Sequence, residues 1–123
     1  PPYELAGLVG EIPNIQFHKG SARLKRSSGG TLDKVVNAMQ THRNLILQID
    51  GHASSEGSAD RNLALSKDRV LSVRDYLIDR GVDPDRLNAR GYGEASLKYD
   101  ESTSSGRQMN RRVEFAWTQT KRR

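Results

Sequence analysis

Residues 49–69 read IDGHASSEGSADRNLALSKDR, and this stretch says more about the fold than any other part of the chain. Its apolar start ends in the turn Gly51-His52, and a loop of small polar residues follows. A helix is expected from about residue 60, and Arg69 lies about two turns into it. The stretch therefore predicts a strand, a polar loop and a helix, with the polar side chains of the loop close to the start of the helix.

Apolar side chains recur with helical spacing in two segments. The first predicts an amphipathic helix capped by Ser28 or Thr31, with apolar residues at Leu32, Val35, Val36 and Met39. The second helix is expected from about residue 60 to residue 80, and Gly81 is the type of residue that ends a helix in a left-handed conformation. Its predicted buried stripe consists of Leu63, Val70, Val73 and Leu77.

Four segments are predicted to be strands: residues 12–17, 45–50, 87–92 and 113–117. Segment 45–50 begins apolar on both faces, as expected of an interior strand. Residues 99–108 are rich in Ser, Thr and charge, which predicts a mobile loop. The order β-α-β-α-β-β predicts an α+β fold, a mixed sheet with helices packed on one face.

Composition limits what the chain can be. A length of 123 residues suits one domain, expected over residues 12–118, after a lead-in at 1–11 and before a basic tail at 119–123. The start Pro1-Pro2 without Met is typical of a fragment, so any signal or anchor is expected upstream. No apolar run approaches the roughly 20 residues of a membrane-spanning helix, and there is no cysteine for disulfides or thiol chemistry.

The net charge of +5 permits contact with anionic polymers. Three of the positive charges belong to residues 121–123, which favours a solvated basic tail over a nucleic-acid patch. No RNA-recognition signature is visible, so no nucleic-acid partner is expected. The three histidines show no metal-ligand spacing, and no nucleophile–base or carboxylate pair stands out. Neither an enzymatic activity nor a metal or cofactor is therefore expected.

The stretch 49–69 resembles the signature of OmpA-like peptidoglycan-binding domains, the C-terminal module of OmpA, Pal and MotB proteins. That signature reads roughly G-H-T/A-D-x-x-G, four residues, then N-x-x-L-S-x-x-R, and the two glycines, Asn62, Leu65, Ser66 and Arg69 match it in register. Further matches are Gly81-Val82, Gly91-Tyr92-Gly93-Glu94 and Asn110-Arg111-Arg112-Val113-Glu114-Phe115, so the resemblance extends from about residue 12 to residue 117. The family's acidic residue falls on Ser54 and is missing.

The resemblance implies a ligand, the stem peptide of peptidoglycan, held at meso-diaminopimelate, which presents a carboxylate and an ammonium together. Arg69 matches the family's cation, and a guanidinium can meet a carboxylate with two parallel hydrogen bonds. Ser54 replaces the ammonium-binding Asp, a loss expected to cost on the order of 1.5–3 kcal/mol. Lys19 and Gly20 stand where the family often has an aromatic and an acidic or amide residue, so the pocket is expected to be more cationic.

The candidate ligand-binding residues are Arg69, Asn62, Ser54, Ser55, Glu56, Leu65, Lys19, Gly20 and His52. Several have a structural alternative. Asn62 could cap the helix, and Arg69 could be solvated or form an internal ion pair. Glu56 either restores the charge lost at Ser54 or faces solvent. His52 either lines the pocket or completes a turn.

The leading interpretation is a non-catalytic module that binds peptidoglycan stem peptides and anchors an envelope protein. The expected location is the periplasm of a Gram-negative bacterium, as part of a protein anchored in the outer or inner membrane. The alternative is an OmpA-like domain with a degenerate ligand site, serving as a structural or protein-interaction module in an envelope assembly. The residues Ser54, Lys19 and Gly20 favour this alternative.

Overall fold

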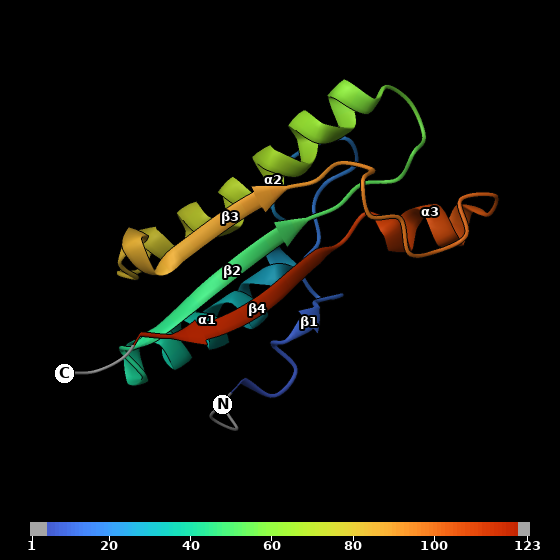
Figure 1. The fold of residues 1–123 in the computed structure, drawn as a ribbon. Coiled ribbons are helices and arrows are strands. Elements are labelled where there is room, and N and C mark those ends of the chain that lie inside the picture. The colour runs from blue at the N-terminus through green and yellow to red at the C-terminus, as the bar shows by residue number, and fades with distance from the viewer. Residues whose placement is uncertain (1–4, 121–123) are drawn as a thin grey trace.

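The computed structural model describes residues 5–120 and has a four-stranded mixed sheet with helices on one face (Figure 1). The elements in chain order are β1 (Gly10–Glu11), α1 (Gly29–Thr41), β2 (Leu45–Gly51), α2 (Ala59–Asp79), β3 (Leu87–Gly91), α3 (Ser104–Asn110) and β4 (Val113–Gln119), with short 3-10 turns at Arg26–Ser28 and Pro84–Arg86. The sheet order is β1-β4-β2-β3, in which β2 and β3 are parallel and β4 is antiparallel to β2. The α+β class and the mixed sheet are confirmed.

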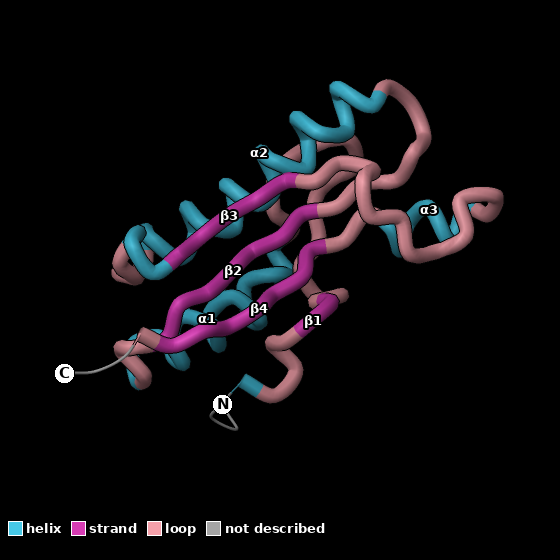
Figure 2. Tube along the Cα trace, viewed as in Figure 1, coloured by secondary structure: helices cyan, strands magenta, loops and turns pink. Residues whose placement is uncertain are grey.

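The core lies between the sheet and the two long helices. Every second residue of β2 is buried, and these residues meet the predicted apolar stripe of α1 and the stripe of α2. Figure 2 shows α1 and α2 on the same face of the sheet, whereas α3 lies beyond the end where β2 finishes and β4 begins. The loops that follow β2 and precede β4 therefore meet α3 at that end of the sheet.

Helix α2 approaches the sheet closely because glycines face it. A Cβ atom on Gly51 would lie 2.6 Å from Val70 Cγ1, and one on Gly91 would lie 2.4 Å from the backbone nitrogen of Lys67. Buried Ser66 completes this contact, since its hydroxyl accepts a hydrogen bond from Gly93 N at 2.9 Å. The predicted stripe of α2 thus has one correction: Ser66 is fully buried and Leu63 only partly, because the chain at Gly93 passes against the helix here.

The end of α2 follows the prediction. Gly81 has a φ of 97°, a left-handed conformation that glycine adopts without strain. Its N–H bonds to Ile78 O at 2.9 Å, and Val82 N–H bonds to Leu77 O at 3.1 Å. These two bonds form a Schellman motif, and the apolar contact of Val82 with Leu77 completes it.

The predicted first strand, 12–17, is wrong in position. Only Gly10–Glu11 pairs with β4, and within 12–17 only Phe17 makes an isolated bridge, to Leu24. A turn intervenes because Ile15 N–H bonds back to Ile12 O at 3.1 Å. Ser28 stands at the start of α1 without capping it by a side-chain bond; its hydroxyl instead bonds both the N–H and the C=O of Gln16.

The predicted mobile loop at 99–108 is also corrected, since it contains the start of α3. The side chain of Thr103 caps this helix by accepting from Gly106 N at 2.9 Å. Asn110 then fixes its end: the side chain is 0% exposed, accepts from Lys98 N and Tyr99 N, and donates to Tyr99 O.

Two of the described residues of the predicted lead-in, 1–11, pack on the domain. Leu5 and Leu8 are buried, and Trp117 Nε1 donates to Leu8 O at 2.8 Å. Of the predicted basic tail at 119–123, Gln119 belongs to β4, while residues 121–123, which carry its charge, lie outside the described residues. None of the helices within residues 5–120 has the length and hydropathy to cross a membrane.

Candidate ligand-binding site

The loop between β2 and α2 is held at both ends by the neighbouring chain. His52 N–H bonds to Arg112 O at 2.9 Å, and Ala53 N–H bonds to Gly93 O at 2.8 Å. Ser58 is the N-cap of α2 and accepts from Arg61 N at 3.3 Å. The loop is therefore a fixed platform at the end of the sheet.

Asn62 braces this loop from the first turn of α2. Its Nδ2 donates to Ser54 O at 3.1 Å and to Glu56 O at 2.9 Å. These bonds satisfy backbone carbonyls that a turn would otherwise leave to water. The amide nitrogen thus has a structural task, and only the amide oxygen of Asn62 remains for a ligand.

Ser54 lies inside the loop. Its side chain is 1% exposed, and its hydroxyl accepts from Glu56 N at 3.3 Å. Where the family signature has an acidic residue, this chain has the neutral hydroxyl of Ser54, which closes a tight local turn.

Glu101 ties the loop to α3. Its Oε1 accepts from both the N–H and the hydroxyl of Ser55 at 2.7 Å, and its Oε2 accepts from Asn110 Nδ2 at 2.7 Å. Desolvation raises the pKa of Glu101, but the hydrogen bonds from Ser55 and Asn110 outweigh it, and the pKa falls below its usual value. The carboxylate is therefore ionised and fully used inside the domain.

Glu56 forms ion pairs with two arginines. Its Oε1 lies 3.0 Å from Arg111 Nη2 and its Oε2 lies 3.3 Å from Arg107 Nε. The side chain of Glu56 is largely exposed, so each pair contributes little to stability on its own. The sequence left two alternatives for Glu56: to restore the charge lost at Ser54 or to face solvent. In the structure the carboxylate is paired with arginines, so it is neither an unpaired charge beside Ser54 nor without partners in solvent.

Arg69 projects from α2 beside this cluster. Its Nε donates to Ser21 O at 2.9 Å, and its guanidinium carbon lies 5.0 Å from the centre of the Phe17 ring. Burial, and then the nearby charge of Arg111, lower the pKa of Arg69, although a guanidinium remains protonated at neutral pH. Among residues 5–120, no carboxylate lies within ion-pair distance of Arg69. An oriented cation with a second cation nearby is suited to binding an anion.

Three other predicted residues lie around Arg69 without polar contacts to it. Lys19 and Gly20 form an exposed turn next to Ser21, in which Gly20 has a φ of 65° and Ser21 N–H bonds to His18 O. Leu65 is half-buried in the second turn of α2. Lys19 places a positive charge on the turn that precedes Ser21.

His52 is a structural residue in this arrangement. Its ring is 7% exposed and stacks on Tyr92 with a centroid separation of 5.3 Å. Its Nε2 lies 3.8 Å from Glu114 Oε1, and Glu114 also binds Arg112. Burial, and then the charge of Arg112, lower the pKa of His52 despite the opposing influence of Glu114 and Asp50. The imidazole is therefore neutral at pH 7.

We expect the free energy of unfolding to fall as the pH drops below about 6.5, because of His52. The unfolded chain takes up a proton at this histidine near pH 6.5, whereas the folded protein, with its lowered pKa, does not. Proton uptake then favours the unfolded state, with a slope of at most about 1.4 kcal/mol per pH unit. Urea unfolding at pH 8, 6.5 and 5.5 should show a shallower dependence for His52→Gln than for the wild type. Equal slopes would contradict this role.

The structure thus gathers Ser54, Ser55, Glu56, Asn62 and Arg69 at one end of the sheet, while His52 turns inward. The sequence did not single out Phe17, Glu101, Arg107, Asn110 or Arg111 as parts of this site. Thr103 before a small polar run was the only local signal for α3. Three or more His, Asp or Glu side chains nowhere cluster as metal ligands within residues 5–120.

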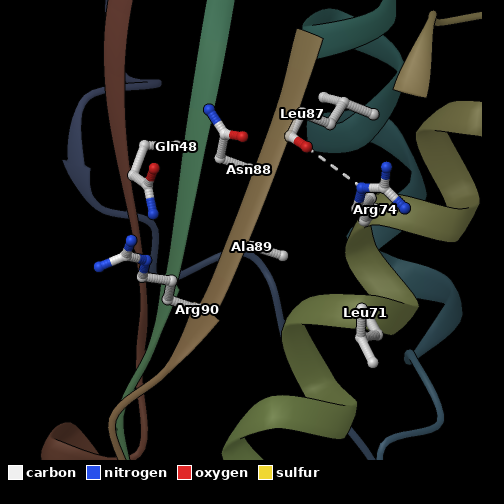
Figure 3. Close-up of a pocket in the computed structure, with 7 residues that line it drawn as sticks. All are labelled: Gln48, Leu71, Arg74, Leu87, Asn88, Ala89 and Arg90. Carbon is white, nitrogen blue, oxygen red and sulfur yellow. Dashed lines mark hydrogen bonds between the residues drawn. The ribbon is translucent and has the colours of Figure 1, made fainter. Parts of the chain in front are cut away.

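A separate hollow of about 530 Å³ lies on another part of the molecule, between α2 and the edge strand β3 (Figure 3). Arg74 crosses from the helix to the strand here and donates to Leu87 O at 3.2 Å. The hollow is lined by Gln48, Leu71, Arg74, Leu87, Asn88, Ala89 and Arg90, none of which the sequence singled out as a ligand residue.

Comparisons with known proteins identify the family of the chain. A family model described as the OmpA family matches residues 16–111. The chain is 36% identical over 102 residues to the "Probable lipoprotein YiaD" of Escherichia coli (strain K12), which covers 83% of this chain and 47% of that protein. It is 34% identical over 79 residues to the peptidoglycan-associated lipoprotein of Rhizobium meliloti (strain 1021), covering 64% of this chain and 45% of that protein.

The solved structure of a MotB-like protein from Desulfovibrio vulgaris superposes with a TM-score of 0.76 at 26% sequence identity, covering 88% of this chain and 70% of that chain. The chain spans less than half the length of the two curated relatives. Taken with the fold and with the family model, these matches establish that the chain belongs to the OmpA family.

Proposed function

We propose that this domain is a non-catalytic module that binds peptidoglycan through the carboxylate of a stem peptide. The observation that carries the proposal is Arg69, which is fixed by Ser21 O and Phe17, is close enough to Arg111 for that charge to lower its pKa, and has no carboxylate partner among residues 5–120. Like charges brought together in a partly buried place favour the binding of an anion between or beside them. One of the relatives is named a peptidoglycan-associated lipoprotein, which supports this class of ligand.

The geometry supports a ligand carboxylate on the terminal nitrogens of Arg69. The bond to Ser21 O uses Nε, so the two Nη groups are left to form a planar fork. Lys19, on the exposed turn next to Ser21, and the loop at 54–56 would contact the rest of a peptide. The module would anchor an envelope protein to the cell wall in the periplasm of a Gram-negative bacterium.

Replacing Arg69 with alanine is expected to lower binding to purified sacculi about ten- to a hundredfold. The estimate corresponds to the loss of a charge-assisted bond worth roughly 1.5–3 kcal/mol. Arg69→Lys should restore binding only partly, because an ammonium keeps the charge but loses the fork. The measurement is a sedimentation pull-down with sacculi over a range of protein concentrations.

Arg61→Ala is the matched control, since Arg61 is an exposed arginine on the same helix and should leave binding unchanged. Circular dichroism of Arg69→Ala checks that the loss of the bond to Ser21 has not unfolded the domain. Equal retention of wild type and Arg69→Ala would rule out the role of Arg69, and no retention of the wild type would rule out the module.

A second candidate function is a structural or protein-interaction module in an envelope assembly. The observation that favours it is the Glu56 carboxylate, which already occupies Arg107 and Arg111 and so stands where a ligand anion could bind. Under this alternative, NMR titration with millimolar stem peptide would shift no amide between Ser54 and Arg69. Shifts confined to that stretch and to Arg111 would favour peptidoglycan binding instead.

A further inference from the structure

The positive charges of the candidate site outnumber the carboxylates that contact it. Three guanidiniums, those of Arg69, Arg107 and Arg111, surround it, and Lys19 lies on the neighbouring turn. Only two carboxylates, those of Glu56 and Glu101, belong to the cluster. The balance alone favours an anionic ligand group over a cationic one.

Both carboxylates already have polar partners on each oxygen. Glu56 has one oxygen on Arg111 and the other on Arg107. Glu101 has one oxygen on Ser55 and the other on Asn110, which is completely buried. At Glu56, an ammonium would meet a carboxylate whose charge two arginines already offset, so it would gain little. At Glu101, it would compete with the bonds that hold α3 to the loop.

Within residues 5–120, no carboxylate other than those of Glu56 and Glu101 bonds to the loop at 54–56 or to its arginines. Asp60 and Asp68 on α2 are exposed, Glu94 is half-buried, and none of the three forms an ion pair in the described part of the chain, while Asp50 accepts from Gln48 Nε2 on β2. At Ser54 the loop has a hydroxyl that is 1% exposed and accepts from Glu56 N. A buried neutral oxygen can neither reach an ammonium directly nor compensate its charge.

We propose that this domain recognises its peptide through the carboxylate alone and is indifferent to the amine beside it. The inference rests on the proposed function, because it concerns the same site and the same peptide. The ligand class is therefore broader than stem peptides that carry both the carboxylate and a free amine. Stem peptides whose amine is free, cross-linked or absent should bind equally well. The domain would thus accept cross-linked wall as readily as free stems.

The test is a calorimetric titration of the whole chain with three synthetic tripeptides. One ends in meso-diaminopimelate, one in 2-aminopimelate, which keeps the side-chain carboxylate but lacks the amine, and one in diaminopimelate with that carboxylate amidated. We expect the first two dissociation constants to agree within about threefold and the amide to bind at least about tenfold more weakly.

A loss of more than about tenfold on removing the amine would overturn the inference and leave the proposed function intact. Equal binding of the amide would overturn it too, because the carboxylate would then not be the recognised group. Absence of binding by all three peptides would overturn the proposed function, and the inference with it.

Two variants of Ser54 sharpen the test. Ser54→Asp adds a carboxylate at the position and should create a preference of about tenfold for the peptide with the amine. Ser54→Asn introduces a side chain of the same size as aspartate but without charge, and it should create no such preference. The pair therefore separates the effect of charge from that of a larger side chain in a buried place. Equal preferences in Ser54→Asp and Ser54→Asn would contradict the proposal, and the wild-type comparison decides it even if neither variant folds.

Discussion

Replacing Gly91 with alanine is expected to lower the free energy of unfolding by about 3 kcal/mol. The new Cβ would lie 2.4 Å from the backbone nitrogen of Lys67 and 2.6 Å from its Cα. Backbone atoms of a helix cannot turn aside as a side chain can, so α2 as a whole must move away from β3. That movement would also loosen the packing of Val70 and Val73 against the sheet. Urea unfolding followed by far-UV circular dichroism measures the change.

Gly30→Ala is the matched control for this experiment. Gly30 lies in the first turn of α1, and a Cβ atom there would meet no atom within 4 Å. The same substitution is expected to stabilise the protein by about 0.5–1 kcal/mol, since alanine is the better helix former. If the free energy of unfolding of Gly91→Ala lay within about 1 kcal/mol of the wild-type value, the close approach of α2 to β3 would be refuted.

Asn110→Ala is expected to lower the free energy of unfolding by about 2–4 kcal/mol. The side chain is 0% exposed and has four partners: it accepts from Lys98 N and Tyr99 N and donates to Tyr99 O and Glu101 Oε2. Truncation would leave two backbone amides and a carbonyl without partners in a buried place. Urea unfolding gives the free energy.

Asn110→Asp refines this prediction. A carboxylate keeps the acceptor for both amides but loses the donor, and it places a negative charge beside Glu101. Above about pH 5 this variant should be as unstable as Asn110→Ala, and acid should partly restore it. Full stability of Asn110→Ala would show that the hydrogen bonds of Asn110 do not hold α3 in place.

Regular periodicity made the centre of the fold predictable. In β2 the side chains alternate with the pleat of the strand, and in α1 the apolar residues repeat with the helical turn, so the physical cause of each element is visible in its own residues. The end of α2 at Gly81 was equally predictable, because the bonds that end this helix require a residue in the left-handed conformation, which glycine adopts most easily.

Elements that depend on distant partners were not predictable. β1 has only two residues, and it exists because Glu11 pairs with Glu114 at the far end of the chain. Segment 12–17 has the apolar content of a strand, yet its side chains reach the core through a turn. α3 has no apolar stripe, and polar bonds from Asn110 and Glu101 hold it to the domain.

The candidate site divides in the same way. The loop and the first turns of α2 followed from the sequence stretch 49–69, so Asn62 and Arg69 were predicted to face one region. The use of each polar atom could not be predicted. Whether Glu56 is free depends on Arg107 and Arg111, which lie more than fifty residues later in the chain.

The polar attachment of α3 has a consequence for amide hydrogen exchange. The amides of β2 lie between two paired strands, so they should exchange with solvent only when the entire domain opens. The helix α3 is joined to the β2–α2 loop through Ser55, Glu56 and their partners, and these contacts can separate while the sheet stays closed. Exchange in α3 should therefore be faster than in β2. A bound peptide that bridges Arg69 and Arg111 should slow it selectively, which makes this short helix the natural reporter of occupancy.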